Sequence, residues 1–134
     1  MEFTKKEFVS WINENGILTI PYGVTEIPDE TFCKNENINE VIFPRSIKRI
    51  GNFAFCQCNN LKKIKFSYGI SEIGYWAFDR CISLETLFLP NSLQFINNGS
   101  FANCERLKEV YVSTDTKINM FSFSEKWQTK INKY

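Results

Sequence analysis

The amino-acid sequence predicts an α/β repeat fold: a stacked solenoid with a curved parallel β-sheet on its concave face, short turns or 3-10 segments on its convex face, and a helical cap at each end. A pattern recurs every 23 residues without an insertion, so the segment beginning at Ile50 is repeated from Ile73. Apolar residues also hold set places in every repeat. One repeat cannot bury its apolar face alone, so neighbouring repeats stack and equivalent residues meet as ladders.

Six columns of equivalent residues carry this pattern. Five are apolar, and the sixth holds three cysteines and an asparagine. The columns are Ile27, Ile50, Ile73 and Ile96; Phe32, Phe55, Phe78 and Phe101; Ile38, Leu61, Leu84 and Leu107; Val41, Ile64, Leu87 and Val110; Phe43, Phe66, Leu89 and Val112; and Asn35, Cys58, Cys81 and Cys104.

The repeat unit closely resembles the BspA-like class of leucine-rich repeats. Its pattern is I-G-x-x-A-F-x-x-C-x-x-L-x-x-I-x-F-P-x-x-I, and the resemblance extends from Leu18 to about Val112. The resemblance implies a curved leucine-rich repeat solenoid that binds proteins or surfaces and has no activity of its own. Many members of that class are cell-surface adhesion or interaction proteins of bacteria and protists.

The chain of 134 residues fits a single leucine-rich repeat domain, 1–134. We expect an N-terminal capping helix at 1–16, about four 23-residue repeats over 18–112 and a C-terminal cap at 113–134. In the first helix, Thr4 and Glu7 form a capping box, and an apolar stripe follows at helical spacing. Its alternative role is that of an amphipathic helix for a partner.

Five three-residue strands are expected to form one parallel sheet. The flanking residues of each triplet should face the core and the middle residue should face outward, because side chains alternate along a strand. The triplets are Leu18-Thr19-Ile20, Val41-Ile42-Phe43, Ile64-Lys65-Phe66, Leu87-Phe88-Leu89 and Val110-Tyr111-Val112. Pro21, Pro44 and Pro90 follow three of the strands and end them.

The segments between the strands are too short for stable helices and predict turns or 3-10 segments. Gly51 and Gly74 suit unusual backbone angles there. After Val112 the 23-residue period fails. Ser122 with Glu125, and an apolar pair formed by Trp127 and Ile131, then predict a C-terminal helix over 122–132.

Composition argues against catalysis. The chain has no histidine, which removes the commonest general base and metal ligand. No nucleophile elbow, phosphate-binding loop or zinc-protease helix occurs, and the pair Cys56-x-Cys58 lacks the spacing of a redox or metal motif. We therefore expect no enzymatic activity, no cofactor and no metal site.

The five cysteines favour a reducing compartment, because their number is odd and three of them share one column. We expect these three to be buried free thiols. A bridge between Cys33 and Cys56, which share another column, is left open. The N-terminus has no apolar run suited to a signal peptide or membrane span, so a cytoplasmic protein is expected, with surface display by a non-standard route as the alternative.

The outward strand positions suggest a binding surface for a protein partner. Three of them are apolar, which is the usual mark of a protein contact, although β-propensity alone also favours such residues on a pleated face. The residues predicted to bind protein are Ile42, Lys63, Lys65, Phe88 and Tyr111. Phe53 and Trp76 lie outside the core columns and could instead form a convex contact or a self-association surface.

A basic segment favours an acidic partner. Residues 41–71 contain no acidic residue and six basic ones: Arg45, Lys48, Arg49, Lys62, Lys63 and Lys65. Nucleic acid is disfavoured, because the net charge is only +1 and no known nucleic-acid-binding module occurs. A solvated face explains the same charges equally well.

Two other roles remain open beside that of a binding scaffold. The residues Lys63-Ile64-Lys65-Phe66 match a docking pattern of regulators of type-1 protein phosphatase, although Ile64 and Phe66 also belong to the core columns. The chain could therefore be a regulatory subunit of such an enzyme. It could also be a self-assembling structural or adhesion protein, in which the apolar stripes of copies pair.

Overall fold

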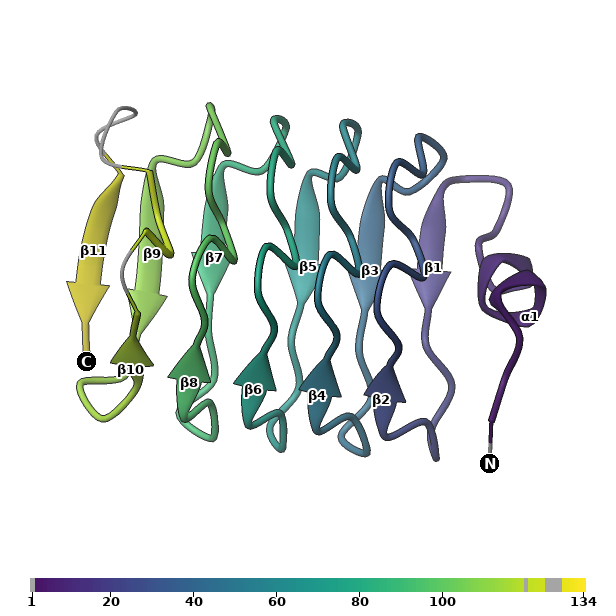
Figure 1. The fold of residues 1–134 in the computed structure, drawn as a ribbon, viewed down its shortest axis with the longest axis horizontal. Coiled ribbons are helices and arrows are strands. Elements are labelled where there is room, and N and C mark those ends of the chain that lie inside the picture. Colours follow the sequence, from purple (N-terminus) through teal and green to yellow (C-terminus); the bar gives the residue numbers. More distant parts are fainter. Residues whose placement is uncertain (1, 120, 125–128) are drawn as a thin grey trace.

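The computed structural model describes residues 2–119, 121–124 and 129–134. The chain coils into a row of stacked turns, with the N-terminal helix at one end and the last strand at the other (Figure 1). Each turn contributes one strand to each of two layers, so the predicted solenoid is confirmed as a parallel β-solenoid of five turns. No helix of the described part is long and apolar enough to cross a membrane.

The longer strands form one layer, whose outer surface we call the strand face. They are β1 (Ile17–Thr19), β3 (Glu40–Ile42), β5 (Lys63–Lys65), β7 (Thr86–Phe88), β9 (Glu109–Val112) and β11 (Lys130–Lys133). All of the pairings are parallel. The layer is not the single sheet that the sequence predicts. It consists of two three-stranded sheets, β1-β3-β5 and β7-β9-β11.

A second layer of two-residue strands was not predicted. It is one continuous sheet in the order β10-β8-β6-β4-β2. The strands are β2 (Glu26–Ile27), β4 (Arg49–Ile50), β6 (Glu72–Ile73), β8 (Phe95–Ile96) and β10 (Lys117–Ile118). They begin the segments that the sequence assigns to turns. Hydrogen-bonded turns follow them, and no 3-10 helix occurs in the described ranges.

The turns require left-handed backbone at residues that are not glycine. Phe53 and Trp76, one repeat apart, both have φ of +56°, and Gln57 and Arg80 repeat this four residues later. Each amide donates to the next turn, as Phe53 N does to the Tyr75 carbonyl at 2.9 Å. These ladder bonds offset the cost of the backbone conformation, roughly 1–3 kcal/mol each.

Gly51 and Gly74 are required because a side chain would not fit, and not because of an unusual backbone angle. This corrects the prediction. Neither has positive φ. A Cβ on Gly51 would lie 2.6 Å from Asp29 Oδ1 and 2.7 Å from the Ile27 carbonyl oxygen. On Gly74 it would lie 2.6 Å from Asn52 Oδ1. Adjacent turns approach too closely here for any side chain.

The core between the two layers consists of the predicted ladders. Phe55, Phe78 and Phe101 are fully buried and stack nearly parallel, with ring centroids 5.0 and 5.1 Å apart. Buried thiols form a second ladder, in which Cys81 donates to the Phe55 carbonyl at 3.2 Å and Cys104 to the Phe78 carbonyl at 3.2 Å. All five cysteines are free, so Cys33 and Cys56 are not bridged.

The predicted N-terminal capping helix is much shorter than 1–16. Thr4 and Glu7 do form a capping box, but α1 spans only Lys5–Ser10 and ends at Trp11. An antiparallel bridge between Ile12 and Leu18 then leads the chain into β1. Six residues give too few hydrogen bonds for an independent helix. The ring of Phe8 instead fixes the segment, 6.0 Å from that of Phe32.

The predicted C-terminal helix is wrong. Residues Lys130–Lys133 form β11, with Ile131 paired to Val110. The repeat continues after Val112 but is shorter, since the ring of Phe123 stacks on that of Phe101, 22 positions earlier, and Ile131 lies 21 positions after its partner Val110. The Ser122 hydroxyl is buried and donates to the carbonyl of Asn119 rather than capping a helix. Glu125 and Trp127, which also suggested the helix, lie outside the described residues.

Candidate protein-binding face

The five predicted binding residues all lie along the strand face, on β3, β5, β7 and β9. Their exposure decreases toward both ends of the row. Phe88 is 64% exposed, Lys63 and Lys65 are exposed, and Ile42 and Tyr111 are half-buried. The alternation of strand side chains is therefore as predicted.

Phe88 and Tyr111 form a flat aromatic platform. The parallel register of β7 and β9 places them side by side, with ring centroids 4.9 Å apart and planes 6° from parallel. The Tyr111 hydroxyl donates to Glu109 Oε2 at 2.5 Å. This hydrogen bond raises the pKa of Tyr111 above its ordinary value. The stacking and this hydrogen bond fix the Tyr111 ring beside that of Phe88.

The six basic residues of segment 41–71 do not form one patch. Arg49 lies on β4 in the other layer, where it pairs with Glu26 at 2.7 Å and Glu72 at 3.6 Å. Lys65 pairs with Glu40 at 3.5 Å on the strand face. Within the described ranges, Lys62 and Lys63 have no carboxylate within 4.0 Å. The same holds for Arg45 and Lys48 in these ranges, so the lysines without a carboxylate partner at the strand face, Lys62 and Lys63, are those at the start of β5.

The ladder of hydrogen bonds breaks between β5 and β7. Phe43 N donates to the Lys65 carbonyl at 3.0 Å, and Leu89 N to the Tyr111 carbonyl at 2.9 Å. Among the described residues, the equivalent bond from Phe66 N to the Phe88 carbonyl is missing. Figure 1 shows β5 and β7 farther apart than the other neighbouring strands of their layer, whereas β6 and β8 remain paired in the other layer.

A cleft of about 710 Å³ opens where the ladder breaks. It is lined by Lys62, Lys63, Ile64, Lys65, Phe66, Glu85, Thr86 and Phe88. Ile64 remains 7% exposed, whereas its equivalents Val41, Leu87 and Val110 are fully buried. The cleft brings three predicted residues together, Lys63, Lys65 and Phe88. Ile42 and Tyr111 lie one strand away on either side.

The residue that directly follows the strand does not account for the break. Pro21, Pro44 and Pro90 hold this position in three turns, whereas serine holds it after β5 (Ser67) and after β9 (Ser113), and β9 remains paired with β11. The Ser67 hydroxyl donates back to the Phe43 carbonyl. This bond links the end of β5 to the turn of β3.

The repeat pattern decides the family. Residues 17–133 match the BspA type leucine-rich repeat region in six copies. The chain belongs to this family. The match includes the shortened last turn, beyond the point at which the period of 23 ends.

Several solved structures share the fold. A leucine-rich cell surface protein from Faecalibacterium prausnitzii aligns with a TM-score of 0.84 and 31% identity, over 90% of this chain and 32% of its own. A Treponema leucine-rich repeat protein (T. pallidum) aligns with a TM-score of 0.56 and 26% identity, over 74% and 59%. The pneumococcal vaccine antigen PcpA shows the fold at a TM-score of 0.63 and 16% identity, over 88% and 36%.

The chain spans from about a third to somewhat over half of the length of these neighbours. No curated protein matches it.

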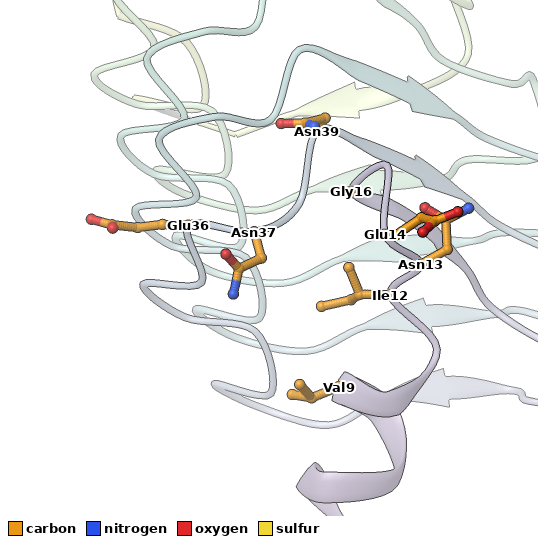
Figure 2. A pocket seen from close by; sticks show the side chains of 8 residues that line it. All are labelled: Val9, Ile12, Asn13, Glu14, Gly16, Glu36, Asn37 and Asn39. Atoms are coloured by element: carbon orange, nitrogen blue, oxygen red, sulfur yellow. The ribbon is translucent and has the colours of Figure 1, made fainter.

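A second cavity, of about 500 Å³, lies at the N-terminal end of this BspA-type solenoid (Figure 2). Its polar groups already hold the local turn. Asn13 Oδ1 accepts from the amides of Asn15 and Ile17, both at 2.9 Å, and Asn39 Nδ2 donates to the Asn15 carbonyl at 3.1 Å. With its amides engaged in this way, the cavity is a feature of the first turn rather than a second site.

The aromatic residues of the turns give no comparable platform. Trp76 is half-buried, and its ring packs directly against Gly99, the equivalent residue of the next turn. Phe53 is 39% exposed. Trp76 therefore contributes to stacking between turns, which leaves the strand face as the better candidate.

Proposed function

We propose that this chain is a non-catalytic binding module that holds a protein partner on its strand face. The observation that carries the proposal is the Phe88–Tyr111 platform: an aromatic ring that is 64% exposed, stacked on a fixed neighbour and placed beside an apolar cleft. Binding energy at protein interfaces concentrates in a few central aromatic and basic residues. Here the aromatic residues Phe88 and Tyr111 lie beside the basic residues Lys63 and Lys65 on the strand face.

The family supports the class of function, because leucine-rich repeats generally mediate protein contacts or adhesion. The neighbour from Faecalibacterium prausnitzii is a cell surface protein. For this chain we keep a reducing compartment as part of the proposal. Its support is the set of five free thiols, four of them buried.

The test compares two exposed aromatic residues on opposite layers. A partner is captured on the purified chain, identified by mass spectrometry and then titrated directly by calorimetry. Phe88→Glu should weaken its binding by about 30-fold or more, because a hot-spot aromatic contributes roughly 2 kcal/mol. The matched control is Phe95→Glu, which changes a 41% exposed phenylalanine on β8. Both variants should keep the wild-type circular dichroism spectrum.

The opposite result, loss of binding with Phe95→Glu only, would place the interface on the other layer and refute the proposal. Light scattering of the chain alone separates the alternatives. A stable dimer that Phe88→Glu dissociates would indicate self-assembly instead of a different partner. The phosphatase-regulator alternative gains no support from β5, because Ile64 faces the core and Phe66 is half-buried.

A further inference from the structure

We infer that the cleft between β5 and β7 binds an extended, acidic segment of the partner and takes one large apolar side chain from it. This inference rests on the proposed function and names the chemistry of the partner. Its basis is the coincidence of three features at one place: a break in the strand ladder, an apolar floor and a surplus of lysine side chains.

The floor of the cleft is suited to an apolar side chain. Ile64 on β5 and Phe66 directly after β5 form it, and Phe88 lies at its far edge on β7. The Phe66 ring is held in place, since it stacks on Phe43 at 5.5 Å and meets Phe78 edge-on at 6.3 Å. A volume of about 710 Å³ exceeds one side chain, so the adjoining main chain of a segment also fits.

The unpaired backbone favours an extended segment. In the described part of the chain, Phe66 N–H has no hydrogen-bond acceptor, and the bond expected from Glu85 N–H to the Lys62 carbonyl is missing as well. All of these residues line the cleft. Backbone groups that leave water need new partners, and an extended chain offers alternating donors and acceptors.

Charge complementarity selects an acidic segment. Three lysines, 62, 63 and 65, line the cleft against one carboxylate, that of Glu85. Lys65 is engaged by Glu40 at 3.5 Å, whereas Lys62 and Lys63 have no carboxylate within 4.0 Å in the ranges described. Carboxylates that flank the apolar anchor would meet these two ammonium groups, whereas a basic segment would be repelled.

The probe is a fluorescein-labelled peptide, Asp-Glu-Asp-Trp-Asp-Glu-Asp, whose binding to the intact chain is followed by fluorescence anisotropy. Two matched peptides carry glycine in place of tryptophan, or lysine in place of every carboxylate. The acidic tryptophan peptide should bind at least about tenfold more tightly than either, because both the anchor and the charges contribute. Equal binding of all three peptides would overturn the inference.

Variants of the chain locate the site. Thr86→Trp fills the cleft from an exposed position, and Lys62→Glu with Lys63→Glu reverses its rim. Each should reduce peptide binding at least about tenfold. The matched control is Lys108→Glu, at the same place in the repeat as Lys62 but two turns further along and outside the cleft. An equal loss with Lys108→Glu would reduce the effect to general charge attraction and overturn the inference.

The captured partner distinguishes this inference from the proposed function. If Phe88→Glu abolishes partner binding and Thr86→Trp leaves it unchanged, the strand face binds but the cleft is not the anchor site. If neither changes partner binding, both fail. A dimer of the chain that Thr86→Trp dissociates would identify a second copy as the occupant, which also overturns the inference.

Discussion

The phenylalanine ladder provides the sharpest test of how the solenoid is stabilised. Phe78 is fully buried, and its ring lies between those of Phe55 and Phe101, at 5.0 and 5.1 Å. Phe78→Ala should lower the free energy of unfolding by about 3–5 kcal/mol, the usual cost of removing a buried phenylalanine and leaving a cavity. Since domains are stabilised by only about 5–15 kcal/mol, the variant should be close to unfolding.

The matched control is the last ring of the same ladder. Phe123 stacks on one neighbour only, Phe101 at 5.5 Å, and is half-buried. Phe123→Ala should cost about 1 kcal/mol, because its ring is only partly buried and stacks on one neighbour instead of two. The two costs are measured by urea unfolding at equilibrium, with the dependence on urea concentration checked for two-state behaviour. Equal costs, or a cost below about 1 kcal/mol for Phe78→Ala, would refute stacking as the main source of stability.

Two further predictions follow from the packing of the turns. Burial raises the pKa of Cys104 to about 12, from an ordinary 9.0. Above pH 9 the unfolded chain therefore loses a proton that the folded chain keeps, and stability falls by up to about 1.4 kcal/mol per pH unit for this thiol. Cys104→Ala should make the decline between pH 8 and 10 shallower in urea unfolding under reducing conditions, and an unchanged slope would contradict the burial of the thiol. Gly51→Ala should cost about 1–3 kcal/mol by the same assay, because its Cβ would lie 2.6 Å from Asp29 Oδ1; a neutral result would show that the turns can separate.

The repeat could be predicted from sequence because identical contacts recur. A residue such as Phe55 meets its own equivalents on both sides, so spacing alone identifies the ladder. The ends of the chain lack this redundancy. The last turn is two residues shorter than the 23-residue period where it reaches β11, and Ser122 then resembles a helix cap although it bonds to the Asn119 carbonyl within a turn.

Only part of the cleft could be predicted from the sequence. Its residues Lys63, Lys65 and Phe88 are predictable as outward positions, since strand alternation suffices. The break in the ladder cannot be predicted in this way, because strand alternation does not tell whether β5 pairs with β7 as well as with β3. Ser67 in place of proline is not a sufficient cue, because Ser113 holds the equivalent position after β9, which remains paired with β11.

Hydrogen exchange of single backbone amides, followed by nuclear magnetic resonance, tests the interrupted ladder most directly. The equivalent amides of Ile20, Phe43 and Leu89 donate to carbonyls of the next strand at 2.9–3.0 Å, and that of Phe66 has no such acceptor among the described residues. The Phe66 amide should therefore exchange at least about tenfold faster than the other three in the free chain. Equal protection of all four amides would show that the ladder is continuous. That result would contradict both the break between β5 and β7 and the proposed binding of a segment in the cleft.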